Sequence, residues 1–96
     1  METFKIKGIL KEKGELRTGQ TSRGEWKRQQ FIVEVQSGEY VDPVAFDAWG
    51  EAIDALEEIN IGEAVEVTFT IRSRKWQDRW FTDINAVNVE GQDMPF

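Results

Sequence analysis

The sequence predicts an all-β protein, a small barrel of five strands with one helix between the third and fourth strands. Three observations lead to this prediction. Apolar and polar residues alternate in several separate segments, residues typical of turns lie between those segments, and one internal segment has helical spacing instead. The chain has 96 residues, which suits one domain with a single modest core.

The first strand is predicted from alternation near the N-terminus. Phe4–Lys7 alternates apolar and basic residues, and Gly8 interrupts the pattern where a bend or bulge is expected. The strand continues to about Arg17. Thr18–Gly24 is rich in glycine and small polar residues, which predicts a loop.

Two further strands follow and are joined by a short turn. Trp26–Gln36 is predicted as the second strand because alternate apolar residues share one face, namely Phe31, Val33 and Val35. Ser37–Glu39 supplies the turn, and Tyr40–Phe46 is predicted as the third strand.

One segment has the spacing of a helix. The predicted helix spans Asp47–Asn60, with Asp47 as its N-cap and Gly62 just beyond its end. Trp49 begins the apolar side of this helix, so we expect it to pack against the core.

The last two strands flank a polar loop. Glu63–Arg72 alternates strictly, and its apolar face is formed by Val65, Val67, Phe69 and Ile71. Ser73–Arg79 predicts a loop, and Trp80–Val89 is the last strand. The order of three strands, a helix and two strands is that of the OB-fold, a five-stranded Greek-key barrel. We expect residues 1–90 to form this domain and residues 91–96 to form a short C-terminal tail.

The charges are unevenly distributed along the chain. The net charge is −6, yet all 12 lysines and arginines lie in two stretches, residues 5–28 and 72–79. At physiological salt the Debye length is about 8 Å, so a bound polyanion is affected mainly by nearby charges. An acidic protein of this kind can therefore present a positive groove.

The basic stretches coincide with the loops that flank the oligonucleotide-binding face of an OB-fold. Cations contact the phosphates of single-stranded nucleic acid and aromatic rings stack on its bases, and both residue types collect in these loops. The strongest aromatic candidate is Trp76, whose polar neighbours leave its ring no core to join, whereas Trp80 suits a core position equally well. The candidate binding residues are Arg17, Arg23, Trp26, Lys27, Arg28, Tyr40, Arg72, Arg74, Lys75, Trp76, Arg79 and Trp80.

Other functional classes are disfavoured by composition. The chain has no cysteine and no histidine, which removes disulfides, thiolate ligands and the commonest general base. We therefore expect no catalytic activity, no metal site and no cofactor. No apolar run approaches the roughly 20 residues of a membrane span, and no signal peptide is recognisable, so a cytoplasmic location is expected.

The second half of the chain resembles bacterial single-stranded DNA-binding proteins. The resemblance lies in Val44–Phe46, in Ile61 and Gly62 after a helix, and above all in Ile71–Asp78 and Arg79–Ile84. It implies single-stranded DNA as the ligand and a base-stacking role for Trp76. The first half is closer to a group of small uncharacterised bacterial OB domains.

The C-terminus adds a second resemblance to the same family. Asp93, Met94, Pro95 and Phe96 are similar to the acidic tip by which these proteins recruit replication and repair partners. The terminal carboxylate would dock in a basic, apolar pocket of a partner. The long linker usual in the family is replaced here by Glu90–Gln92.

Two other functions remain open from the sequence. The acidic span of residues 29–71 and the tail also suit a protein-interaction OB module, and stacking and phosphate contacts serve RNA as well as DNA. The family often forms tetramers, which implies a homo-oligomer. The first strand could pair with its copy across a two-fold axis.

Overall fold

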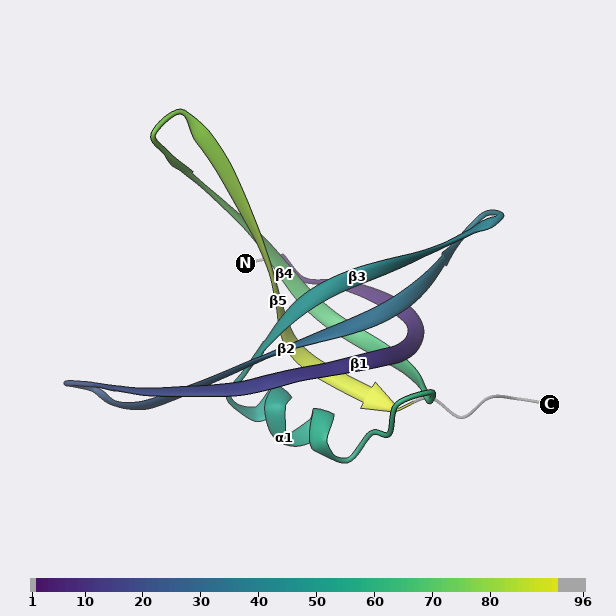
Figure 1. The fold of residues 1–96 in the computed structure, drawn as a ribbon, viewed down its shortest axis with the longest axis horizontal. Helices are drawn as coiled ribbons and strands as arrows, with labels where there is room; N and C mark the ends of the chain where they lie inside the picture. The colour runs from purple at the N-terminus through teal and green to yellow at the C-terminus, as the bar shows by residue number, and fades with distance from the viewer. Residues whose placement is uncertain (1, 92–96) are drawn as a thin grey trace.

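The computed structural model of the protein describes residues 2–91. The candidate tip residues Asp93, Met94, Pro95 and Phe96 lie outside the described residues. Within residues 2–91 the chain forms five strands and one helix (Figure 1), in the order β1 (Phe4–Thr21), β2 (Gly24–Ser37), β3 (Tyr40–Trp49), α1 (Glu51–Glu57), β4 (Ala64–Trp76) and β5 (Arg79–Gly91).

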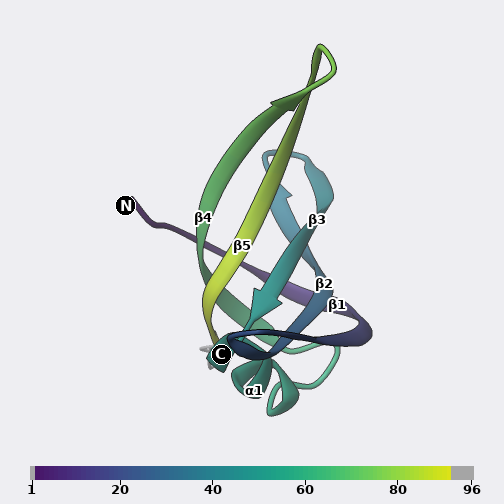
Figure 2. The ribbon, with the colours of Figure 1, turned by 90° about the vertical axis from the view of Figure 1, so that its left-hand side faces the viewer.

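The strands form a closed barrel in the order β1-β2-β3-β5-β4. All neighbouring strands are antiparallel except β3 and β5, which run parallel and meet at only two residue pairs. β1 curves so that its first part, Phe4–Ile9, pairs with β4 and the remainder pairs with β2 (Figures 1 and 2). The predicted OB-fold is confirmed.

The bend of β1 depends on Gly8. A Cβ atom at this position would lie 2.3 Å from the carbonyl oxygen of Glu34 and 2.6 Å from Cγ1 of Val33. No side chain fits in that space, so β1 reaches β2 closely enough to close the barrel only with glycine here. This is the position where the sequence predicts a bend or bulge.

The core fills the barrel and extends to the helix. The predicted inward face of β2 is confirmed, because Phe31 and Val33 are fully buried and Val35 packs against the core. Phe31 stacks on Phe46 of β3 with ring centroids 5.4 Å apart. Figure 1 shows α1 beneath the barrel, where its buried side chains Ala52, Ile53 and Leu56 close the open end.

The predicted helix is too long at both ends. β3 continues through Asp47 and Trp49, and α1 begins only after Gly50, which has a φ of 54° and serves as the N-cap without a side-chain hydrogen bond. The strand is favoured because Asp47 and Ala48 pair with β5 while Trp49 pairs with β2. Within residues 2–91, no helix is long and apolar enough to cross a membrane.

The two loops predicted at Thr18–Gly24 and Ser73–Arg79 are wrong. β1 and β2 pair as far as a turn at Ser22 and Arg23, and β4 and β5 pair as far as a turn at Gln77 and Asp78. Both residues of the second turn have positive φ, as in the tight turns that favour twisted hairpins. These ribbons are held by backbone hydrogen bonds and have no core to bury, so most of their side chains are polar on both sides. The sequence therefore shows no alternation of apolar and polar residues there.

Ile71 also departs from its predicted core position. It lies on the same side of β4 as Val67, but 51% of its surface is exposed. The neighbouring Thr70 is the last buried residue of β4, with 6% exposed. Beyond this point the β4–β5 ribbon leaves the barrel and has no core beneath it (Figure 1).

Gly8→Ala tests the close approach of β1 to β2. We expect the free energy of unfolding to fall by about 1–3 kcal/mol, because the added methyl group collides with the backbone at Glu34 and forces β1 outward. Urea denaturation followed by circular dichroism measures the change. Lys5→Ala, at an exposed position of the same strand, is the control, and equal stability of the two variants would contradict the role given to Gly8.

Candidate nucleic-acid interface

The strand pairings determine which candidate residues share a face. Side chains alternate along a strand, and directly paired residues of neighbouring strands point to the same side of the sheet. In β1, β2 and β3 the side away from the core carries Arg17, Trp26, Arg28 and Trp49, because Arg17 pairs with Arg28, and Arg28 with Trp49. We call this side, and its continuation over β5 and β4, the outer face.

An aromatic cluster occupies the outer face near the β1–β2 hairpin. The Trp26 ring lies directly over Gly19 of β1, where a Cβ atom would be 2.5 Å from the indole. Trp26 and Trp49 have ring centroids 6.3 Å apart and are tilted by 47°. The guanidinium carbon of Arg28 lies 5.7 Å from the Trp49 centroid, within the range of a cation–π contact. The side chains of Trp26, Trp49 and Arg28 are thus held by mutual contact, with Gly19 leaving room for the Trp26 ring.

Trp49 also connects the two halves of the barrel. Its indole nitrogen donates a hydrogen bond of 2.9 Å to Oδ1 of Asn85 on β5. The parallel pairing of β3 and β5 places Asp47 opposite Asn85 at the same junction. Trp49 nevertheless keeps 41% of its surface exposed. It is therefore anchored along one edge and open to solvent elsewhere.

The β4–β5 ribbon continues the outer face with a second mixture of cations and rings. Its outward pairs are Arg72 with Asp83, Arg74 with Phe81, and Trp76 with Arg79. Trp76 is 63% exposed, as expected for a ring far from the core. Phe81 belongs to the next outward pair toward the barrel, on the same side as Trp76.

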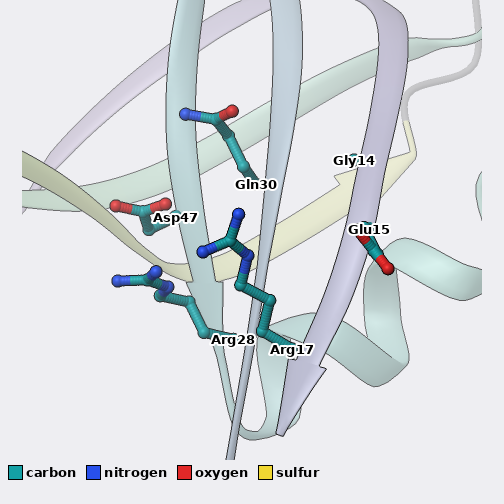
Figure 3. Close-up of a pocket in the computed structure, with 6 residues that line it drawn as sticks. All are labelled: Gly14, Glu15, Arg17, Arg28, Gln30 and Asp47. Atoms are coloured by element: carbon teal, nitrogen blue, oxygen red, sulfur yellow. The ribbon is translucent and has the colours of Figure 1, made fainter.

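Three adjoining depressions connect these side chains. The first, of about 190 Å³, is lined by Gly14, Arg17, Arg28, Gln30 and Asp47, with Glu15 at its edge and pointing away (Figure 3). The second, of about 460 Å³, shares Arg28 and Asp47 with the first and reaches across the junction to Trp49, Arg72, Arg74, Asp83 and Asn85. The third, of about 390 Å³, shares Arg74 and adds Lys75, Trp76 and Phe81. We call the three together the outer groove.

The arginines of the outer groove are available to an anion. Among residues 2–91, the ion pairs within 4.0 Å join Lys7 to Glu66 and Lys27 to Glu25. Neither pair involves a groove arginine. Asp47 and Asp83 lie in the groove, but within the same residues no carboxylate comes within 4.0 Å of a groove guanidinium. Over that part of the chain, no group of three or more acidic, cysteine or histidine side chains could hold a metal ion.

Several predicted binding residues do not join this groove. Lys27 pairs with Thr18 and Trp80 with Lys75, which places Lys27 and Trp80 on the side that continues the barrel interior. Tyr40 lies on that side too, at the far hairpin between β2 and β3. Arg23 lies in the turn at the tip of the β1–β2 ribbon. Lys75 still lines the third depression from its position beside Trp76.

The structure adds outer-groove residues that the sequence analysis missed. Trp49 is not a helical core residue but part of the aromatic cluster, and Phe81 takes the place expected of Trp80. A two-residue turn at Gln77 and Asp78, read from the sequence, would have given the register of the β4–β5 ribbon. That register places Phe81 opposite Arg74. No local pattern reveals Trp49, because its position depends on its own pairing with β2 and on the pairing of Asp47 and Ala48 with β5.

Known structures resemble this chain over nearly its whole length. A mitochondrial single-stranded DNA-binding protein from S. cerevisiae aligns with a TM-score of 0.69 at 10% identity, covering 94% of each chain. A dimeric PriB N-terminal domain from Thermoanaerobacter tencongensis gives a TM-score of 0.62 at 19% identity, covering 96% of this chain and 97% of the other. A small single-stranded DNA-binding protein from Streptomyces coelicolor gives 0.57 at 14% identity, covering 95% and 94%.

These similarities confirm the fold expected from the resemblance in the second half of the sequence. Among curated proteins, none matches the chain by sequence. A family model described as a domain of unknown function, DUF3127, matches residues 5–90. Because this match spans most of the sequence, the chain belongs to the DUF3127 family.

Proposed function

We propose that the protein binds single-stranded DNA in the outer groove and catalyses no reaction. The observation that carries this proposal is the continuity of the groove. In it, arginines that form no ion pair within residues 2–91 alternate with exposed aromatic rings from β1 to the tip of the β4–β5 ribbon. Single-strand binding requires both components in one path. The solved structures with the same fold include proteins described as single-stranded DNA-binding.

The groove residues divide into two roles. Arg17, Arg28, Arg72 and Arg74 would contact successive phosphates and release counterions. Trp76 and Phe81 at one end, and the Trp26–Trp49 cluster at the other, would stack on bases whatever their sequence. Lys27, Tyr40 and Trp80, which are exposed on the opposite side of their ribbons, have no part in this arrangement. Arg79, which pairs with Trp76, would contact the DNA backbone at the tip of the ribbon.

The proposal extends to assembly. A single barrel offers one short groove, and the PriB domain with the same fold is dimeric. We propose that this protein also forms a homo-oligomer, which would join grooves of neighbouring copies into a longer path. Size-exclusion chromatography with light scattering measures the number of copies, and a monomer at micromolar concentration would contradict this part of the proposal.

Trp76→Ala and Trp80→Ala form a matched pair, because both remove an exposed indole from the same ribbon but from opposite sides. We expect Trp76→Ala to weaken oligonucleotide binding by about 1–3 kcal/mol, the usual contribution of one stacked base. Trp80→Ala should leave affinity unchanged. Fluorescence anisotropy with a labelled oligonucleotide measures both. Equal losses of affinity in the two variants would contradict binding of the oligonucleotide on the Trp76 side of the ribbon.

The salt dependence of binding tests the arginines. Four phosphate contacts predict a slope of about −3 for log K against log salt, at roughly −0.7 per phosphate of a single strand. Arg74→Gln should make the slope shallower by about 0.7. Lys11→Gln, which removes one charge from β1 outside the groove, should lower affinity less and keep the slope. A slope near zero for the unmodified protein would exclude phosphate-driven binding.

Competition between DNA and RNA oligonucleotides of matched sequence and length reports which nucleic acid the protein prefers.

A further inference from the structure

The centre of the outer groove contains negative charge where a polyanion is proposed to lie. The 460 Å³ depression at the β3–β5 junction is lined by Asp47 and Asp83 as well as by Arg28, Arg72 and Arg74. Both aspartates are half-buried, unlike the exposed acids of α1. A carboxylate in this position opposes phosphate binding, so its presence in the groove requires another explanation.

Asn85 has its orientation fixed between these carboxylates. An indole N–H can only donate, so the bond from Trp49 identifies the Asn85 atom it reaches as the carbonyl oxygen. The amide nitrogen of Asn85, with its two donors, then points away from the indole. Asp47 is the strand partner of Asn85, and Asp83 precedes it by two residues on the same face of β5. The same-face neighbours of this amide donor are therefore two carboxylates, Asp47 across the junction on β3 and Asp83 along β5.

This arrangement matches the edge of a base better than it matches a phosphate. Carboxylates accept hydrogen bonds from exocyclic amino groups, as from N4 of cytosine, and an amide N–H donates to ring nitrogens and carbonyl oxygens. Cytosine, adenine and guanine carry such an amino group, whereas thymine has a carbonyl oxygen at the corresponding position. A thymine carbonyl facing Asp47 or Asp83 would oppose acceptor to acceptor.

We propose that the β3–β5 junction is a base-reading subsite that selects amino-bearing bases over thymine. In this subsite Asp47 and Asp83 accept from the exocyclic amino group, and Asn85 donates to the neighbouring acceptor of the same base. The exposed surface of Trp49 supplies a wall of the subsite, and Arg28 and Arg72 hold the flanking phosphates. The inference rests on the proposed function and adds a specificity that stacking alone does not give.

Oligo-dC and oligo-dT provide the direct comparison, because the two pyrimidines have rings of the same size and present opposite hydrogen-bonding groups at positions 3 and 4, apart from the 5-methyl group of thymine. We would use equal lengths of about 15 nucleotides, within the usual range for one OB-fold. We expect oligo-dC to bind roughly 5- to 150-fold more tightly, the discrimination expected of one well-formed side-chain–base pair. Equal affinities, or tighter binding of oligo-dT, would overturn the subsite and leave the proposed function intact.

Asp47→Asn and Asp83→Asn separate base reading from simple electrostatics. Each variant keeps the side-chain shape and removes one negative charge, so both oligonucleotides should gain from reduced repulsion. If the carboxylates read the base, the ratio of oligo-dC to oligo-dT affinity falls toward one in these variants. If the carboxylates only weaken phosphate binding, both affinities rise together and the ratio stays unchanged, which would overturn the proposal.

Asp54→Asn is the matched control, because it removes the same charge from an exposed position of α1 outside the groove. It should alter neither the ratio nor the fold, and circular dichroism of all variants checks the latter. If the unmodified protein binds neither oligonucleotide at low salt, the proposed function and the subsite fail together. That outcome is distinct from equal binding, which removes the subsite alone.

Discussion

The parallel contact between β3 and β5 is the interaction on which both the barrel and the outer groove depend. It consists of two residue pairs, Asp47 with Asn85 and Ala48 with Ala86. Ala48 and Ala86 are buried in the core, and small side chains here let the two strands approach. The other two residues face outward, where the bond from Trp49 to Asn85 spans the same junction. Without this contact the pairing of β1 with β4 would still join the strands, but as an open sheet with β3 and β5 at opposite edges, and the arginines of the two ribbons would not share one groove.

The core and the outer groove both result from the alternation of side chains between the two faces of each strand. Because Phe31 and Val33 point into the barrel, Arg28 and Gln30 on the same strand must point out, toward the groove. The register of the β4–β5 ribbon extends this rule beyond the barrel, where no core remains to enforce it. Hydrophobic packing in the barrel thus decides which side of a solvent-exposed ribbon carries Trp76 and which carries Trp80. A shift of one residue in this register would exchange the two faces.

The sequence predicted the elements whose signals are local. Alternation identified the first, second and fourth strands, and turn residues set off the third and fifth, which together gave the order of the OB-fold. The polar surroundings of Trp76 marked it as an exposed ring. Failures occurred where a non-local pairing outweighed a local pattern. Residues 47–60 have genuine helical spacing, but pairing with β2 and β5 keeps Asp47 and Trp49 in a strand. The paired ribbons at both tips look like loops in sequence because their side chains are polar on both sides.

The acidic residues that give the chain its net charge of −6 lie in two different environments. Glu51, Asp54 and Glu57 lie exposed on α1 at the closed end of the barrel, where they repel a polyanion from the surface outside the groove. Asp47 and Asp83 lie half-buried among arginines, within a Debye length of any strand in the groove. Charges on the helix act through solvent and are screened by salt. The groove carboxylates would meet a ligand of the proposed kind directly, so their effect would depend on which hydrogen-bonding group that ligand places against them.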